Sequence, residues 1–292
     1  MPDYKPSKLG STQCGRSIFH WGQRTYVMGV VNVSPDSFSG DGLADVEEAV
    51  ARAKRLASEG ADIIDIGGES TRPGSTPIST NEELRRVIPV VEKLAVEISV
   101  PLSVDTYKLE VARQTLNAGA NMINDIWGLK KEPRLAELAA QKGVPLVLMS
   151  NQRDSLCPDI MSAIISDLKR AIKQALDAGV PWENIIIDPG IGFGKTPEQN
   201  LEVLRCLEEL QTLNRPILLA SSRKFSIRGL FNSTPKQRLN EVAFVPKRKQ
   251  RLEETAAIIA IGIAKGVDIV RVHDVKEMAR VCQMSDAIVR GV

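Results

Sequence analysis

Two kinds of polar side chain follow the apolar runs of this sequence. Asp105, Asn124 and Asp188 each end a short apolar run and offer a compact carboxylate or amide group. Such groups suit the edge of a flat nitrogen heterocycle that carries amino and oxo substituents. A second set is cationic or can become so: Arg72, Lys224, Arg271 and His273. Cations suit a phosphate or diphosphate. Together the two sets predict a site for a heterocycle joined to a phosphorylated leaving group.

The segment DPGIGFGKT, residues 188–196, holds three alternating glycines between an aspartate and a Lys-Thr pair. A Walker A phosphate loop would need glycine in place of Pro189, and a dinucleotide-binding turn would need glycine in place of Lys195. Both motifs are therefore excluded. The glycines either let the backbone approach something closely or form a mobile lid, and the sequence leaves both open.

Extended apolar segments alternate with amphipathic ones from Tyr26 onward, which is typical of β/α units around a parallel sheet. The eight predicted strands are Tyr26–Val31, Asp62–Ile66, Leu102–Val104, Asn121–Ile123, Leu146–Met149, Asn184–Ile187, Pro216–Ala220 and Asp268–Val272. Residues 46–57 illustrate the helical spacing between strands. Glycine follows five predicted helices, at positions 60, 119, 143, 179 and 266, as a left-handed helix end requires.

Eight such units favour an α/β fold, a single-domain (β/α)₈ TIM barrel over residues 26–292. An open doubly wound sheet is the alternative. Residues 1–25 are expected to form an extension packed on or near the bottom of the barrel. In a barrel the carboxyl ends of all strands face one mouth, so the polar residues just beyond them converge. Singly, some have a structural explanation, because Asp105 and Asp274 could cap helices.

Composition narrows the class of protein. The net charge of +2, from 38 basic and 36 acidic residues, does not predict binding to nucleic acid or to an anionic membrane. No apolar run approaches the length of a membrane helix, and the start is polar without the apolar stretch of an export signal, so we expect a soluble protein that is not exported. The four scattered cysteines are expected to be reduced thiols, which predicts a cytoplasmic protein. Two histidines argue against a histidine-rich metal site, whereas a hard cation with oxygen ligands stays open.

Seven segments, in order, resemble the dihydropteroate synthase family across most of residues 26–275. They are MGVVNVSPDSFS (28–39), DIGGESTRPG (65–74), SVDTYK (103–108), INDI (123–126), DPGIGFGKT (188–196), SRK (222–224) and RVHDV (271–275). The resemblance implies a transferase on a TIM barrel. It would condense 6-hydroxymethyl-7,8-dihydropterin diphosphate with p-aminobenzoate, releasing diphosphate and forming 7,8-dihydropteroate.

The resemblance also implies roles for individual residues. Asp105, Asn124, Asp188 and Lys224 would hold the pterin, with Met149 packed on the ring face. Arg271 and His273 would meet the diphosphate, and Asn32 would coordinate its Mg²⁺. Thr71 and Arg72 would lie on a closing loop, and Ser226 would help to hold p-aminobenzoate. The resemblance makes Asp105, Lys224 and Arg271 the catalytic set, and it implies a homodimer.

Two departures from the family pattern bear on the acceptor. Phe225-Ser226 stand in the reverse of the usual order, and Ser150-Asn151 replace the common histidine and methionine. The first predicts altered recognition of p-aminobenzoate and sulfonamides, and the second predicts an altered fifth loop. A pterin-binding paralogue without the coupling activity is therefore one alternative. A methyltetrahydrofolate–corrinoid methyltransferase on a similar barrel is another.

Overall fold

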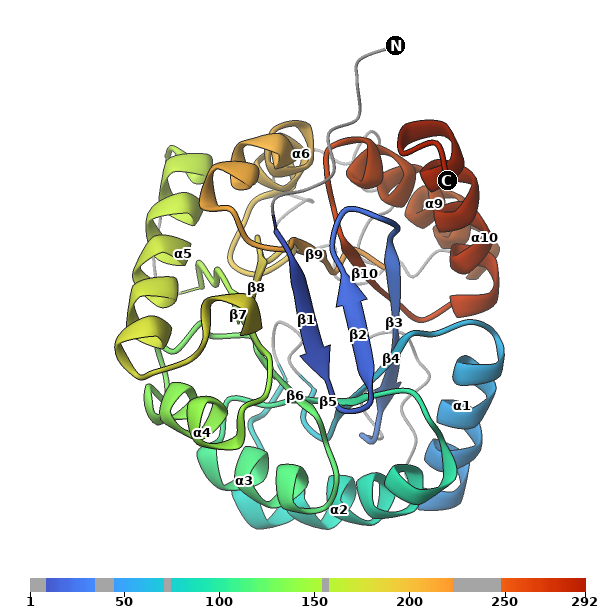
Figure 1. The fold of residues 1–292 in the computed structure, drawn as a ribbon, viewed down its shortest axis with the longest axis vertical. Coiled ribbons are helices and arrows are strands. Elements are labelled where there is room, and N and C mark those ends of the chain that lie inside the picture. The colour runs from blue at the N-terminus through green and yellow to red at the C-terminus, as the bar shows by residue number, and fades with distance from the viewer. Residues whose placement is uncertain (1–8, 35–44, 71–74, 154–157, 223–247) are drawn as a thin grey trace.

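Eight parallel strands form a nearly closed barrel in the computed structural model (Figure 1). The structure describes residues 9–34, 45–70, 75–153, 158–222 and 248–292. The strand order is β8-β7-β6-β5-β4-β3-β10-β9. A bridge between Ile187 and Ile217 joins the two outer strands, and Ile187 N donates to Pro216 O at 3.0 Å. The predicted TIM barrel is confirmed, and the open-sheet alternative is wrong.

The strands fall where the apolar runs predict them. Their bounds are β3 Tyr26–Asn32, β4 Ile63–Gly67, β5 Leu102–Asp105, β6 Met122–Asp125, β7 Leu146–Met149, β8 Ile185–Asp188, β9 Leu218–Leu219 and β10 Ile269–Val272. Each predicted segment overlaps one strand: β7 has the predicted bounds, and the ends of the other strands differ from the predicted ends by at most two residues. The strands β5 and β8 extend one residue further than predicted and β6 extends two, so that the polar residues Asp105, Asp125 and Asp188 still belong to the sheet.

Helices surround the barrel (Figure 1). They are α1 Val46–Ser58, α2 Thr80–Glu97, α3 Leu109–Asn117, α4 Arg134–Lys142, α5 Ile160–Asp177, α6 Pro197–Arg205, α9 Arg248–Ala264 and α10 Val275–Val289, with short 3₁₀ helices η1 Trp182–Asn184 and η2 Leu207–Leu213. Side chains of Asp45, Ser79 and Asp159 cap three of them by accepting from backbone N–H groups. The five glycines predicted after helices all have positive φ.

The two-residue period of the strands separates the interior of the barrel from the layer beneath the helices. Residues 64, 123, 187 and 270 pack in the large core shared with the helices. Their neighbours on the interior face change from apolar to polar toward the carboxyl end. The pairs are Ile63 and Asp65, Met122 and Asn124, Ile186 and Asp188, and Ile269 and Arg271. An apolar floor therefore lies directly beneath a polar mouth.

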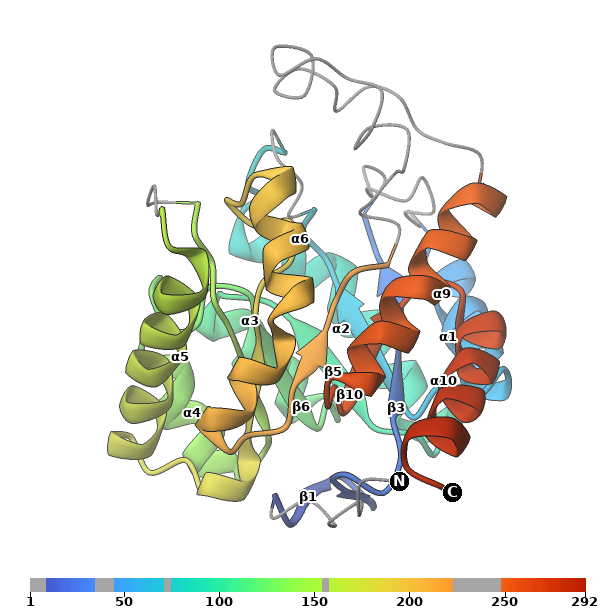
Figure 2. The same cartoon turned by 90° about the horizontal axis from the view of Figure 1, so that it is seen from above.

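An antiparallel hairpin of β1 (Ser11–Cys14) and β2 (Ser17–His20) covers the amino ends of the barrel strands (Figure 2). Phe19, Trp21 and Tyr26 pack together in tilted and edge-to-face arrangements, at ring distances of 4.8 to 5.7 Å, within the apolar floor. Thr12 Oγ1 donates to Glu183 O, and Cys14 Sγ donates to Asn121 O at 3.5 Å. Both acceptors precede strands, which places the hairpin opposite the polar mouth.

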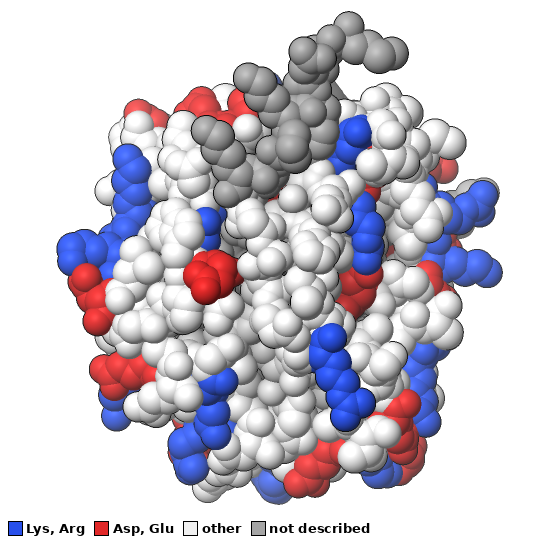
Figure 3. All heavy atoms as spheres, in the orientation of Figure 1, with Lys and Arg blue, Asp and Glu red and all other residues white. Residues whose placement is uncertain are grey.

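The surface seen from the hairpin side carries basic and acidic side chains interspersed with neutral ones (Figure 3). Within the described ranges, no helix has the combined length and apolar character needed to cross a bilayer.

Candidate active site

The strand register brings predicted site residues into one layer. Asn32 of β3 pairs with Gly67, Gly67 with Asp105, and Asp105 with Asn124. Further around the ring, Met149 of β7 pairs with Asp188 of β8. These positions are the last residues of their strands, or the second-to-last in the case of Asn124, so they share the mouth of the barrel. The structure therefore brings Asn32, Asp105, Asn124 and Asp188 to the same end, as the sequence predicts.

Arg271 of β10 reaches into this layer and forms ion pairs with two carboxylates. Its Nε donates to Asp65 Oδ2 at 2.6 Å, and one terminal nitrogen donates to Asp105 Oδ2 at 2.7 Å. Burial lowers the pKa of the Arg271 guanidinium, but Asp65 and Asp105 outweigh burial and raise that pKa above its usual value. The guanidinium is therefore a fixed cation whose orientation two carboxylates determine.

The helix-cap explanation for Asp105 fails, because the N-cap of α3 is Lys108 and Asp105 binds Arg271 instead. Asp274 does precede α10 as its N-cap residue, but its side chain makes no capping hydrogen bond. Helix capping by a side chain therefore explains neither Asp105 nor Asp274.

Asp65 is a site residue that the sequence reasoning missed. It is fully buried in β4, and its Oδ2 also accepts from Asn124 Nδ2 at 3.1 Å. The strand-end rule passes over it because it stands two residues before the end of its strand. A signal was present: an aspartate within the run Ile63–Ile66 places a carboxylate in a buried strand, where a charge needs a partner.

The loop after Asp188 is organised by its lysine and its glycines. Asp188 Oδ1 accepts from Gly190 N at 2.7 Å, and Lys195 Nζ donates to Gly190 O at 2.8 Å and to Ser150 O at 3.3 Å. A side chain on Gly190 would begin 2.0 Å from Ser150 O, and one on Gly194 would begin 2.2 Å from the Gln152 backbone. The glycines thus serve close approach between this loop and its neighbour in the fold.

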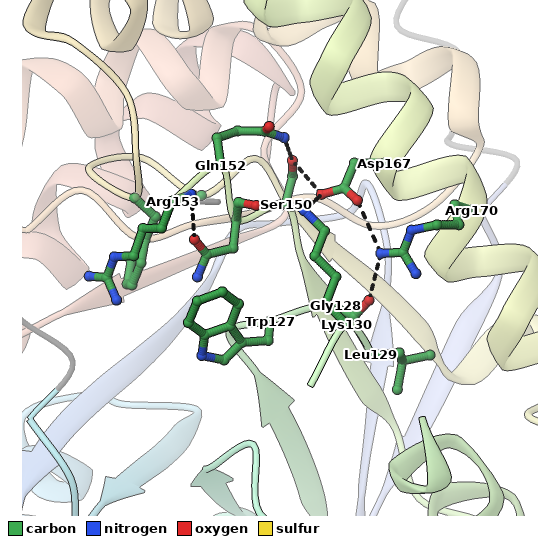
Figure 4. A network of polar contacts seen from close by, with 12 residues as sticks. Trp127, Gly128, Leu129, Lys130, Ser150, Gln152, Arg153, Asp167 and Arg170 are labelled. Carbon is green, nitrogen blue, oxygen red and sulfur yellow. Dashed lines mark hydrogen bonds and ion pairs between the residues drawn. The ribbon is translucent and has the colours of Figure 1, made fainter. Parts of the chain in front are cut away.

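Ser150 and Asn151, where the chain departs from the family pattern, are both buried, and Ser150 belongs to a network of polar contacts (Figure 4). Ser150 Oγ donates to Asp167 Oδ2 at 3.1 Å, and Asp167 forms ion pairs with Lys130 and Arg170. Asn151 Nδ2 donates to Ile126 O at 3.0 Å. Both side chains therefore tie the fifth loop to neighbouring elements. That this loop differs from the loop of the family stays a prediction.

Met149 belongs to a small apolar cluster with Ile126 and Phe193, against which Trp127 packs. The cluster forms the part of the mouth between β6 and β8. Packing of Met149 on a bound ring stays a prediction.

His273 lies just beyond β10 and contacts the seventh loop. Its Nδ1 lies 3.1 Å from Ser222 Oγ, and its backbone N donates to the same hydroxyl at 3.3 Å. Arg52 of α1 donates to His273 O at 3.2 Å. This arrangement places an imidazole at the rim, two residues along the strand from Arg271, where an anion could meet both side chains.

Glu69, in the loop after β4, belongs to a second buried cluster. Lys108 Nζ lies 2.6 Å from both Glu69 Oε2 and Glu83 Oε2, and Tyr107 OH donates to Glu69 Oε1 at 2.9 Å. Burial raises the pKa of Glu83 despite the nearby lysine. Glu69 Oε2 also accepts from Ile78 N at 3.0 Å, so the cluster secures both sides of the loop that carries Thr71 and Arg72.

Several predicted site residues lie outside the described residues: Thr71, Arg72, Lys224, Phe225 and Ser226. Their roles stay predictions. Asn32 is half-buried at the end of β3 and offers an amide oxygen, a hard donor of the kind that Mg²⁺ takes. Mg²⁺ commonly uses one or two protein oxygens and completes its shell with substrate phosphates and water, so the donor chemistry fits.

Known proteins share the sequence and the fold that hold this site. The model of the family described as pterin binding enzyme matches residues 28–273. The dihydropteroate synthase of Clostridium beijerinckii is 47% identical over 285 residues, covering 97% of this chain and 99% of the relative. A dihydropteroate synthase from Clostridium difficile, solved in the presence of pteroic acid, has a TM-score of 0.82 and 45% identity, covering 93% of this chain and 99% of that one. The Xanthomonas albilineans enzyme with 4-aminobenzoic acid has a TM-score of 0.83 and 39% identity, covering 97% and 98%.

Proposed function

This chain belongs to the dihydropteroate synthase family, and we propose that it condenses 6-hydroxymethyl-7,8-dihydropterin diphosphate with p-aminobenzoate to give 7,8-dihydropteroate and diphosphate. The observation that carries the proposal is the Arg271 guanidinium held between Asp65 and Asp105, next to Asn124, in the mouth of a pterin-binding-type barrel. This layer combines acceptors for an amino heterocycle with a fixed cation.

The geometry supports a substitution that needs little proton transfer. The bond between the exocyclic methylene and the diphosphate oxygen breaks, the electron pair leaves with diphosphate, and the positive charge spreads into the pterin ring. Asp105 and Asp188, at the carboxyl ends of β5 and β8, would stabilise that charge. The amine nitrogen of p-aminobenzoate then bonds to the methylene and releases a proton to solvent.

On the leaving-group side, Arg271 and His273 would contact the diphosphate, with Lys224 and Arg72 supplying further cations. Asn32 would hold a Mg²⁺ ion, and the ion would offset the charge that builds on the diphosphate. Thr71 would lie over the reacting atoms, and Ser226 would receive the acceptor carboxylate. The protein's main contribution is then orientation and charge, which suits a site without a nucleophilic triad.

The test is diphosphate release from the dihydropterin diphosphate with Mg²⁺, with and without p-aminobenzoate, followed by detection of dihydropteroate. Arg271→Met serves as the control against contaminating activity. Coupled product supports the proposal. No release by the intact chain, in the presence of bound pterin, contradicts it.

A paralogue that binds pterin but does not couple it is the second candidate, because two family positions are altered. The Ser150 side chain contacts helix α5 and the Asn151 side chain contacts Ile126, so both have structural roles, which weakens the support that these two residues give to this alternative. Release of diphosphate without dihydropteroate would favour it and would direct attention to Phe225-Ser226. The methyltransferase alternative loses support, because the relatives reported above are dihydropteroate synthases.

We also infer a homodimer formed through the carboxyl-terminal helices. Ile261 of α9 is 53% exposed, and Met284 and Ile288 of α10 are 65% and 76% exposed, on two helices that pack together. Exposed large apolar side chains on two helices that pack together suit an interface between copies. Met284→Glu combined with Ile288→Glu should give a monomer in light scattering, whereas Val96→Glu, at an exposed apolar position on α2, should not.

The described cysteines Cys14, Cys206 and Cys282 form no disulfide. This supports a proposed site of action in the reducing cytoplasm.

A further inference from the structure

Asp65 is the residue on which two proposed ligand-binding side chains converge. Its Oδ2 accepts from Arg271 Nε at 2.6 Å and from Asn124 Nδ2 at 3.1 Å. Its other oxygen, Oδ1, has no hydrogen-bond partner within the described ranges, although the side chain is fully buried. Arg271 comes from β10 and Asn124 from β6, which lie on opposite sides of β4 in the strand order. The Asp65 carboxylate therefore connects strands on both sides of its own.

The carboxylate determines how the Asn124 amide is turned. An amide has a donor end and an acceptor end, whereas a carboxylate accepts only. Asn124 must therefore turn Nδ2 toward Asp65, which leaves Oδ1 as the end that Asp65 does not engage. In the same way, Asp65 holds the Nε edge of Arg271 and Asp105 holds one terminal nitrogen. Neither side chain can reverse its polarity without leaving a buried group unpaired.

Gly67 leaves room above this carboxylate. It stands two residues after Asp65 on the same face of β4, and it contributes no side chain between Asp65 and the mouth. A methyl group at Gly67 would lie 3.5 Å from the Asp105 Cβ, which is an ordinary contact. The absence of a side chain at position 67 is therefore a feature of residue choice, because packing alone would tolerate alanine there.

We propose that Asp65 is a positioning residue that sets the order of hydrogen-bond donors and acceptors in the pterin pocket. The inference rests on the proposed function. By fixing Asn124 with its oxygen toward the ligand, Asp65 makes that point of the pocket select a ring carrying an amino group. A ring with an oxo group at the same place would bring two acceptors together. Asp65 thus determines specificity without needing to touch the reacting atoms.

The test compares Asp65→Asn with the intact chain in the binding of two bare rings, pterin and its 2-oxo counterpart lumazine, by calorimetry. The intact chain should prefer pterin by at least about 10-fold, since one mispaired buried group costs that much. In Asp65→Asn the introduced amide can donate, so Asn124 is free to turn. The preference should fall to within about twofold, and KM for the pterin diphosphate should rise roughly 10- to 100-fold with KM for p-aminobenzoate little changed.

Ser103→Ala is the matched control. Ser103 is fully buried, pairs with Asp65 in the sheet, and has a hydroxyl without a partner in the described part of the chain. Losing this hydroxyl should leave the ring preference and both KM values unchanged. A general loosening of the barrel would instead move both variants together.

The exchange D65N/N124D provides a rescue with the same composition and net charge. A carboxylate at position 124 accepts at both ends, so it presents an acceptor to the ligand whichever way it turns. The double variant should regain the preference for pterin over lumazine. If Asp65→Asn alone fails to fold, the ring preference of the double variant still tests whether Asp65 acts through Asn124.

Unchanged ring preference in Asp65→Asn would overturn the inference, as would a folded double variant that shows no preference. Failure of the proposed function looks different: the intact chain would form no dihydropteroate, while the two-ring comparison would still report the role of Asp65.

Discussion

The two ends of the barrel are built from the same strands but from different chemistry. At the amino end, Phe19, Trp21 and Tyr26 stack on an apolar floor that the hairpin covers. At the carboxyl end, two residues further along several of the same strands, carboxylates and a guanidinium occupy equivalent interior positions. One end stabilises the fold by burial of apolar area, and the other holds charges in fixed positions at some cost in stability.

The difference shows what each end can tolerate. An apolar contact can be rearranged at the cost of packing, whereas removal of one member of a buried ion pair leaves the other charge without compensation. We therefore expect substitutions at the amino end to change stability and leave the chemistry alone. Substitutions at the carboxyl end should change activity most.

Arg271→Met should give the largest effect. It removes the cation between Asp65 and Asp105, so kcat/KM should fall at least about 100-fold, and about 3 to 5 kcal/mol of stability should be lost as well. Dihydropteroate formation and urea unfolding measure the two quantities. Arg271→Lys is the control, because it keeps the charge but cannot bridge two carboxylates. Its activity and stability should lie between those of the intact chain and of Arg271→Met. Near-normal activity in Arg271→Met would place the chemistry elsewhere.

Trp21→Ala tests the opposite end. Trp21 is 3% exposed, lies 5.5 Å from the Tyr26 ring and donates to Thr12 Oγ1 at 2.8 Å. Its loss should lower the free energy of unfolding by about 3 to 5 kcal/mol and leave both KM values unchanged in the folded fraction. Ile18→Ala, at an exposed position of the same hairpin, should change stability by less than about 0.5 kcal/mol. A large change in KM with Trp21→Ala would couple the two ends.

The sequence predicts the two ends unequally. Asn124, Asp188 and Arg271 follow from apolar runs that end in polar residues, because parallel strands in a barrel must bring those ends together. Asp65 is signalled only as a charge within a buried strand, and its partner does not follow, since Arg271 lies 206 positions away and only the closed ring brings them together. The hairpin was missed for a similar reason: its short strands carry no long apolar pattern, and its stability comes from the barrel floor.

The two ends also carry one strongly perturbed carboxyl each, which gives a pH-dependent comparison. Burial raises the pKa of Asp125 to about 6 at the carboxyl end of β6, and burial raises the pKa of Asp268 to about 6 just before β10. The folded protein therefore binds protons that the unfolded chain has released. The protonated carboxyl groups contribute stability that is complete below the unfolded pKa of 3.8. This contribution is lost as pH rises through about 6, where the folded protein releases the protons.

Asp268→Asn should accordingly flatten the fall in unfolding free energy between about pH 4 and pH 6, by at most about 3 kcal/mol at about 1.4 kcal/mol per pKa unit. Its activity should be normal, because it lies at the amino end. Asp125→Asn should flatten the same interval but also lower activity, since it adjoins Asn124. The exposed Asp177→Asn is the control, and an unchanged slope in Asp268→Asn would contradict the assignment.

Apart from the controls, Ser150→Ala should give the smallest effect. It tests whether the polar mouth of the barrel extends to this residue. Ser150 is fully buried beside Met149, yet its hydroxyl donates to Asp167 at 3.1 Å and accepts from Gln152 Nε2 at 2.9 Å. Asp167 keeps its ion pairs with Lys130 and Arg170, so the loss should cost about 1 kcal/mol of stability and change kcat/KM less than twofold. Ser58→Ala, which removes an exposed hydroxyl from the end of α1, should cost less still. A marked rise in KM for p-aminobenzoate in Ser150→Ala would show that the departure from the family pattern at this position acts on the acceptor as well as on the loop behind it.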